Sequence, residues 1–506
     1  MTFFESLLAL LAAAIILLQI ARRLRLPYPA MLALAGTLLA FVPGVPSIRI
    51  EPDTALALFI APVLLDAAFD FPVGAAQTLW RPLAMMAIGA VLVTTAAVAW
   101  VGVAAMGLPI AAAVTLGAIV APPDAAAATA VLGSVSIPKR TIAVLKGESL
   151  FNDATALLLF GGALAVQANG GFGPGVAVRL AVAAPGGLVF GIAAGFVTLW
   201  TGRLVAGTLG GSILQFVNTY AVWLLAQHLG LSAVLAEVGC AMTIAASSQV
   251  ARSPRNRVHS FAIWATVVFL LNVLAFLLMG MQARMIVESM TGDHLRSALA
   301  AASAVVLVVI VVRIVLVMAW NRVAVRFDVV RGALPRPTLG QGIFVAWCGM
   351  RGLVTVATAF ALPGDFPQRD VVVLTAFGVV LATLVVQGLT LTPLIRMLKL
   401  DRLEDADRAL ADARRALTEA GSAALAEVSG EPARHVRYGY DVQGRHEEDR
   451  LYRQAGLIAA AAERTRLEAL RADWQLDDTG YYRLQEEIDW RELTHLPEEE
   501  RRIEDG

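Results

Sequence analysis

Long apolar stretches alternate with short polar ones through the first 400 residues of the chain. A membrane core about 30 Å thick takes about 20 apolar residues in a helix, and only helices or closed barrels satisfy backbone polar groups there. The stretches have helical length and lack the alternation of barrel strands. They predict thirteen transmembrane helices, at 3–20, 28–42, 55–69, 83–106, 110–132, 149–166, 176–200, 213–228, 232–247, 261–281, 299–320, 343–362 and 371–394.

Basic residues gather in every second loop of this arrangement. Cytoplasmic loops of membrane proteins are enriched in Lys and Arg, and here one side holds 17 of them against five on the other. We therefore expect a multi-pass protein of the cell (inner) membrane, with the N-terminus outside and the C-terminus in the cytoplasm. The first stretch is read as a retained helix, because no basic region precedes it and no cleavage site follows it.

Charge separates the chain into two parts near Leu400. Residues 1–400 contain 14 acids and 24 bases, whereas the remaining 106 residues contain 26 acids and 16 bases. The chain is 58% hydrophobic and 16% charged, which is too apolar for a soluble domain. We expect 401–506 to be a solvated helical appendage, with helices at 406–426 and 451–474 and a break at 430–444; the alternative is a ligand-sensing domain that regulates the first part.

Ionisable groups at membrane depth are costly, so they normally face a cavity or a partner. Five acids and two bases fall inside or at the mouth of predicted helices. They are Asp66, Asp124, Glu148, Asp153 and Glu237, and Arg313 and Arg351. For Glu237, and for His228 nearby, we expect a structural hydrogen bond rather than a role in transport, because neither has a backbone break or a polar companion beside it.

Asp124 follows two consecutive prolines in the middle of a predicted helix. Pro122 and Pro123 lack N–H donors, so the carbonyls of Ala118 and Ile119 lose their helical partners and the helix should unwind. Non-helical backbone at this depth persists only inside protein or along a wet cavity, and freed carbonyls beside a carboxylate suit a hard cation. The alternative is a proline kink that Asp124 caps.

The run 147–155 opens the next predicted helix with several polar side chains. Helical periodicity places Ser149 and Asp153 one above the other, with Glu148 and Asn152 on a neighbouring face. We expect Ser149 and Asp153 to bind a cation, and Glu148 and Asn152 to brace the site. The alternatives are that Glu148 only caps the start of the helix and that Asp153 is a satisfied structural carboxylate.

Arg313 and Arg351 lie well inside apolar segments. An unpaired guanidinium there is expensive, so Arg313 must find a carboxylate or backbone oxygens. Glycines flank Arg351 and permit a second broken helix, whose electronegative C-terminus Arg351 could offset while it pairs with Glu148. The alternative is that both arginines extend to the membrane surface.

Five segments, taken together, resemble the sodium/proton antiporters of bacteria and archaea that are related to animal sodium/hydrogen exchangers. The strongest is Gly-Glu-Ser-Leu-Phe-Asn-Asp at 147–153, which is similar to that family's motif with adjacent Asn and Asp. The likeness covers most of residues 1–400. The other four segments are Gly-Ala-Ile-Val-Ala-Pro-Pro-Asp at 117–124, Phe-Leu-Leu-Met-Gly at 276–280, Gly-Met-Arg-Gly at 349–352 and Val-Gln-Gly-Leu-Thr at 386–390.

The resemblance implies an all-α polytopic fold of 13 transmembrane helices, built as two inverted six-helix repeats with crossed discontinuous helices at Asp124 and Arg351. It implies a transmembrane antiporter domain at 1–400 and a helical cytoplasmic tail at 401–506. Within the first, 83–168 and 299–398 would form an ion-binding core bundle. This bundle would move as an elevator against a dimerisation bundle, 1–70 and 176–281, in a homodimer.

The resemblance also assigns residues. The family's cation ligands fall on Asp124, Asp153, Ser149 and the main-chain carbonyl of Pro123, and an Asn before the second Asp, here Asn152, accompanies electroneutral exchange in the family. This sequence departs from the family pattern at four positions, which opens the choice among sodium, lithium and potassium. These are Pro123 where Thr is usual, Ala125 where Pro is usual, Asp66 where Glu is usual, and Glu237 where an apolar residue is expected.

We therefore expect a secondary active transporter rather than an enzyme, with no cofactor and no nucleic-acid partner. Sodium, or lithium, and protons would compete for Asp124 and Asp153, because burial disfavours a bare negative charge. The first alternative is a potassium/proton antiporter of the same fold, and the second is a proton-coupled solute symporter. An intramembrane hydrolase is disfavoured, because the apolar segments lack a Ser/His pair or a set of metal ligands.

Overall fold

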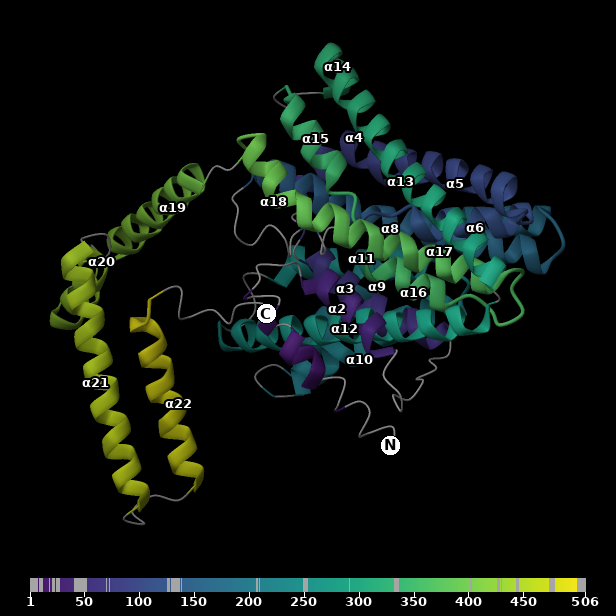
Figure 1. The fold of residues 1–506 in the computed structure, drawn as a ribbon. Coiled ribbons are helices and arrows are strands. Elements are labelled where there is room, and N and C mark those ends of the chain that lie inside the picture. The colour runs from purple at the N-terminus through teal and green to yellow at the C-terminus, as the bar shows by residue number, and fades with distance from the viewer. Residues whose placement is uncertain are drawn as a thin grey trace. The chain divides into compact units, whose positions relative to one another are not determined.

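The computed structural model describes residues 28–40, 52–69, 73–124, 139–205, 210–248, 254–290, 292–331, 336–400, 403–425, 430–442, 446–472 and 478–497, with single positions between these ranges and short pieces of 1–27. Within these ranges every regular element is a helix and none is a strand. The chain divides into two compact units, Met1–Asp401 and Arg402–Asp505. Figure 1 labels the helices of both units.

The first unit is a bundle of helices that pack on one another in several directions (Figure 1). Its elements are α2 (Tyr28–Ala40), α3 (Pro52–Phe69), α4 (Val73–Ala84), η1 (Met85–Ala90), α5 (Val91–Met106), α6 (Ile110–Val120), α8 (Lys139–Ala168), α9 (Pro174–Leu204), α10 (Gly210–His228), α11 (Ala233–Ser248), α12 (Pro254–Ser289), α13 (Gly292–Arg326), α14 (Asp328–Arg331), α15 (Leu339–Trp347), α16 (Leu353–Phe360), α17 (Arg369–Ala382), η2 (Thr383–Gln387) and α18 (Gly388–Met397).

Among the described residues of this unit, five helical stretches are long and apolar enough to cross a membrane. They are Ala76–Met106, Thr141–Ala168, Pro174–Leu204, Leu295–Arg326 and Arg369–Met397. Shorter apolar helices occur as well, among them Thr54–Phe69 and Ala233–Ala246. The predicted all-helical membrane class is thus confirmed. The count of thirteen, the inverted repeats and the orientation stay predictions, and half of the predicted helix at 3–20 lies outside the described residues.

Two helices of the first unit are interrupted within the membrane domain. α6 ends at Val120 and leaves 121–124 without helical structure, and a second interruption separates α15 from α16 at 348–352. Both lie where the prolines and glycines of the sequence predicted them. Two wider π-helical turns, η1 and η2, were not predicted; such turns are frequently found at functional sites.

The long helix α8 corrects one boundary. It begins at Lys139 rather than near Ser149, so the polar run 147–155 lies in the interior of the helix. The predicted helix began at Ser149 because charged residues precede the apolar segment there. The alternative in which Glu148 caps the start of a helix is therefore wrong, because about two and a half turns of helix precede it.

Small residues bring α9 and α11 into close contact. Gly187, Gly191 and Gly195 recur every four residues and form a ridge along one face of α9. A Cβ atom at Gly191 would lie 2.7 Å from the Cα of Ala236 on α11, so only glycine permits this approach. This packing of small residues is typical of helices that associate inside a membrane.

The second unit consists of charged helices. They are α19 (Leu403–Ala424), α20 (Glu431–Val442), α21 (His446–Ala472) and α22 (Asp478–His495). The predicted helices correspond to α19 and α21, but the predicted break at 430–444 is wrong, since it contains α20, and α22 was missed. α21 and α22 pack together through Ala460, Leu467 and Ile488. α20 and α22 are rich in polar residues, so their sequences gave little hydrophobic signal from which to predict a helix.

Candidate functional site

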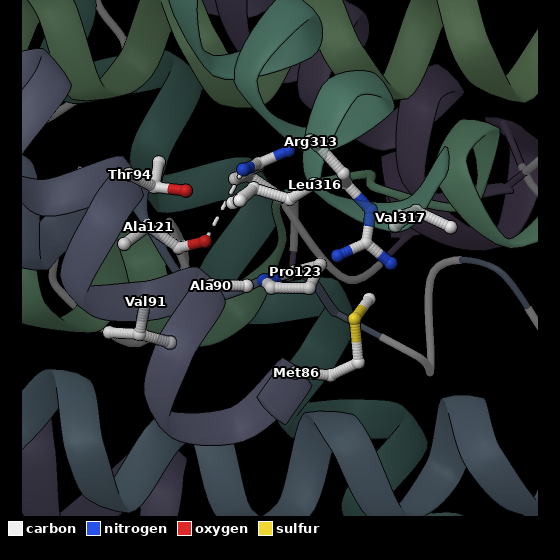
Figure 2. A pocket seen from close by; sticks show the side chains of 10 residues that line it. Met86, Ala90, Val91, Thr94, Ala121, Pro123, Arg313, Leu316 and Val317 are labelled. Atoms are coloured by element: carbon white, nitrogen blue, oxygen red, sulfur yellow. Dashed lines mark hydrogen bonds between the residues drawn. The ribbon is translucent and has the colours of Figure 1, made fainter. Parts of the chain in front are cut away.

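The first break presents backbone carbonyls that Arg351 binds. Its Nε donates to the carbonyl of Val120 over 2.9 Å, and its Nη2 donates to that of Ala121 over 3.3 Å, the bond drawn dashed in Figure 2. The last carbonyls of a helix have no partner within it and carry partial negative charge. The guanidinium therefore stabilises the C-terminal end of α6, within the fully buried surroundings of Arg351.

The second break receives Asp124. The backbone N–H of Asp124 donates to the carbonyl of Met350 over 2.7 Å, and its Oδ2 accepts a hydrogen bond from the N–H of Leu353 over 3.2 Å. Leu353 is the first residue of α16, and a helix N-terminus favours negative charge. Each break thus supplies a side chain of opposite charge to the helix end of the other. We call this arrangement the crossing.

The glycines beside Arg351 make room for the crossing. A Cβ atom at Gly352 would overlap the carboxylate of Asp124, and one at Gly349 would overlap the side chain of Arg313. The carbonyl of Gly349 also accepts a hydrogen bond from Arg351 Nη1. The sequence indicated that these glycines permit an interrupted helix, whereas the structure adds that they leave space for two charged side chains.

α8 brings Asn152 and Asp153 to the first break. Asn152 is fully buried; its Nδ2 donates to the carbonyl of Pro123 over 3.1 Å, and its Oδ1 has no hydrogen-bond partner in the described part of the chain. Asp153 is 6% exposed, and its carboxylate is close enough to that of Asp124 for their charges to interact. Two carboxylates and non-helical backbone therefore lie together in a largely buried place.

Ser149 and Asp66 complete the predicted set. Ser149 lies one turn before Asp153 on α8 and is partly buried, so it is placed on the same face of the helix. Asp66 is half-buried on α3, a helix that packs against α16. The expected roles, Ser149 as a cation ligand and Asp66 in an ion pair, stay predictions.

Glu148 pairs with Arg313. Arg313 donates to both carboxylate oxygens, Nη1 over 2.6 Å and Nη2 over 3.1 Å, and Nη2 also donates to the carbonyl of Val345 over 3.1 Å. The expected pairing of Glu148 with Arg351 is wrong, because the Arg351 donors are directed to backbone carbonyls. The requirement that Arg313 find an anion or backbone oxygens is confirmed. This buried bidentate pair links α8, α13 and α15.

Thr383 and a small cavity belong to the site although the sequence did not single them out. Thr383, the first residue of η2, accepts a hydrogen bond from the N–H of Arg351 over 3.1 Å and donates to the carbonyl of Val379 over 2.8 Å. Threonine is common in membrane helices, so Thr383 gave no signal in the sequence.

The small cavity, of about 10 Å³, lies between Thr94, Pro123 and Arg313 (Figure 2) and has roughly the volume that one water needs.

Glu237 and His228 differ in whether their side chains make a hydrogen bond. His228 Nδ1 lies 2.7 Å from the carbonyl of Leu224, the structural hydrogen bond that was expected. Glu237 is completely buried on α11, and neither of its carboxylate oxygens has a hydrogen-bond partner among the described residues. The expected structural hydrogen bond of Glu237 is therefore wrong.

Comparison with known proteins identifies the family of the chain. The family described as "Sodium/hydrogen exchanger, transmembrane" matches residues 8–397, the whole region that holds both breaks and α8. The chain belongs to the sodium/hydrogen exchanger family.

Relatives of this exchanger-family chain include bacterial antiporters. An uncharacterized Na+/H+ exchanger of Mycobacterium tuberculosis, Rv2287, is 29% identical over 403 residues, which are 77% of this chain and 73% of that protein. The "Sodium, potassium, lithium and rubidium/H(+) antiporter" of Bacillus pumilus is 26% identical over 504 residues, 93% of this chain and 74% of that protein. These proteins are transporters of the same membrane-embedded family.

A solved structure supports the fold of this family member. The sodium proton antiporter MjNhaP1 of Methanocaldococcus jannaschii superimposes with a TM-score of 0.57 at 18% sequence identity, over 77% of this chain and 100% of that one. Identity this low establishes shared architecture only. The match places the first unit in the fold of that antiporter.

Proposed function

We propose that this protein exchanges sodium ions for protons across the membrane, with lithium as an alternative cargo. The observation that carries the proposal is the crossing, where Asp124 lies at the N-terminus of α16 and within electrostatic reach of Asp153. The names of its relatives, which describe exchange of alkali cations for protons, support the same activity.

The oxygens gathered at the first break suit a small hard cation. Sodium prefers oxygen ligands, and the candidates are the carboxylates of Asp124 and Asp153, the Ser149 hydroxyl and the Pro123 carbonyl. The Pro123 carbonyl already accepts one bond from Asn152, but a carbonyl oxygen has a second lone pair. The buried Asn152 Oδ1 is a further oxygen beside the break.

Competition for these oxygens is sufficient for exchange. Two neighbouring carboxylates, one buried and one partly buried, are poorly tolerated when both are charged, and either a sodium ion or protons can neutralise them. Because both ligands use the same oxygens, binding of one expels the other. If the carrier crosses the membrane only when neutralised, outward movement of sodium requires inward movement of protons.

We propose further that the core bundle, 83–168 and 299–398, moves as one body against a dimerisation bundle in a homodimer, and that exchange is electroneutral. Two sets of contacts support joint movement. The Arg313–Glu148 pair joins α8, α13 and α15, and the Arg351 bonds join α6 to the second break. Both sets are buried, so moving one of these helices alone would strand charged groups.

Exchange in proteoliposomes tests the proposal. In vesicles that hold the purified parent protein, addition of sodium should change the internal pH. The Asp153→Asn substitution should abolish this pH change while the protein still folds. Asp370→Asn, an exposed acid at the start of α17, is the matched control and should retain exchange. Unchanged exchange in Asp153→Asn would reject the assignment of Asp153.

Selectivity is decided by the same assay with different cations. The Bacillus pumilus relative is named for potassium and rubidium as well as sodium and lithium, and the loss of a Thr hydroxyl at Pro123 alters the ligand set. Titrating sodium, lithium and potassium separately gives the apparent affinity for each. A potassium response that exceeds the sodium response would establish the potassium/proton alternative.

A further inference from the structure

An apolar groove of about 410 Å³ lies between α13, α15 and α18, away from the crossing. Its volume falls in the range of ligand pockets, about 300–1,000 Å³. Figure 1 shows α15 beside both α13 and α18, and α15 packs against each of them. The walls of the groove include Ile314, Met318, Ile343, Trp347, Pro393 and Met397.

The polar atoms of this groove are already satisfied. Thr390 is its one hydroxyl; it donates to the carbonyl of Val386 over 2.6 Å and accepts a hydrogen bond from Trp347 Nε1 over 2.9 Å. A polar solute would therefore find little to bind inside the groove. Hydrocarbon is the chemistry that fits these walls.

One end of the groove is basic. Asn321 near the end of α13 donates to the carbonyl of Thr338 over 3.1 Å, and Gly340 lies against Leu398, so the end of α13, the start of α15 and the end of α18 meet there. Arg322 lies one turn beyond Met318 on the same face of α13, and Arg396 adjoins Met397.

Charge at this end is strongly one-sided. The stretches 314–347 and 388–400 contain six basic residues against one acid, and that acid, Asp328, pairs with Arg331. The side chains of Arg322, Arg336 and Arg396 are exposed. A basic cluster at one end of an apolar groove between membrane helices is the combination that recognises an anionic lipid.

We infer that this groove binds an anionic glycerophospholipid, with an acyl chain along Met318, Ile343 and Trp347 and with its phosphate among Arg322, Arg336 and Arg396. The charge complementarity selects the headgroup and the apolar walls hold the chain. The site uses no residue of the crossing, so lipid binding is independent of the proposed exchange.

Quenching by brominated lipids tests the inference, because Trp347 forms part of the groove wall. The purified full-length protein is titrated with phosphatidylglycerol or phosphatidylcholine carrying the same brominated acyl chains. The signal of Trp347, one of nine tryptophans, is taken as the difference from Trp347→Phe. Phosphatidylglycerol should quench Trp347 at about one-tenth of the phosphatidylcholine concentration, since each basic residue near a lipid surface contributes appreciably.

Two variants separate a built site from general surface charge. Arg322→Gln/Arg396→Gln should remove most of the preference for phosphatidylglycerol, whereas Arg203→Gln, an exposed arginine in the last turn of α9, should keep it. Equal quenching by both lipids in the parent chain, or equal loss in the Arg203 control, would overturn the inference.

A second measurement excludes a protein occupant. Ile343→Trp fills the groove and should reduce phosphatidylglycerol binding while leaving the oligomeric state, measured by light scattering, unchanged. If this substitution instead alters the oligomeric state and leaves lipid preference intact, a second copy of the chain covers the groove and the lipid site is rejected.

Discussion

Two arginine–carboxylate pairs, one in each unit of the chain, use the same chemistry in different surroundings. In the membrane unit Arg313 and Glu148 are 4% and 1% exposed, and Arg313 bonds to both carboxylate oxygens. In the tail Arg464 bonds to Asp489 and Glu492 across α21 and α22, and Arg464 and Asp489 are 39% and 45% exposed. Water can replace the second set of partners but not the first.

The difference explains why the membrane charges are arranged so specifically. A buried charge without a partner is costly, so Arg313 is directed at a carboxylate and Arg351 at the carbonyl end of a helix. Exposed pairs contribute little and can be rearranged. Glu237 is the exception, since it is buried like Glu148 but has no hydrogen-bond partner among the described residues.

The largest effect should come from breaking the buried pair. Glu148→Gln leaves Arg313 charged and without its anion, which costs about 3–5 kcal/mol. We expect a large fall in the thermal unfolding midpoint in detergent, together with loss of exchange. The double variant Glu148→Gln/Arg313→Met should recover part of the stability, because it removes the stranded charge; a single variant as stable as the parent chain would contradict this role.

The second largest effect should come from adding a methyl group at the crossing. Gly352→Ala places a Cβ atom against the Asp124 carboxylate, so Asp124 must leave the N-terminus of α16 or the break must shift. Exchange in proteoliposomes should fall at least tenfold, about 1.4 kcal/mol in barrier height. Gly364→Ala is the matched control, since a Cβ atom there meets nothing within 4 Å. Equal activity of the two variants would show that Asp124 tolerates displacement.

Glu237→Gln should have a smaller effect, and one of opposite sign to Glu148→Gln. No partner loses its counter-charge, and an amide avoids the cost of an isolated carboxylate in apolar surroundings. We expect the thermal midpoint to stay level or to rise. A fall comparable to that of Glu148→Gln would mean that Glu237 has a partner that stabilises its charge.

The smallest effect should follow from Arg464→Gln in the tail. Hydrogen bonds that Arg464 donates to Glu492, and then to Asp489, raise the pKa of Arg464, so this contribution is lost only at a pH above the range in which the protein is handled. Because the pair is substantially exposed, we expect a loss of about 0.5 kcal/mol and no change in its size between pH 6 and pH 9. Circular dichroism of the full-length protein would measure it; a loss as large as that in Glu148→Gln would remove the distinction between the two units.

The sequence by itself determined the membrane class, both helix interruptions and most of the residues that gather at them, although not Thr383. Apolar length, the prolines before Asp124 and the glycines around Arg351 are local signals, because each acts on its own stretch of backbone. A helix boundary that depends on a contact with a distant residue could not be predicted from the local sequence. α8 continues through Lys146 and Glu148, where hydropathy ended the segment, because Glu148 is neutralised by a residue 165 positions away.

Only the tertiary structure decided which charge meets which. Arg313 and Arg351 both required an anion or carbonyl oxygens, and composition could not distinguish the carboxylate of Glu148 from the end of α6 as the partner of Arg351. The choice depends on the way two interrupted helices pass each other, so that the carbonyls of one lie beside the side chain of the other. Long-range geometry of this kind arises from packing, and no local sequence pattern specifies it.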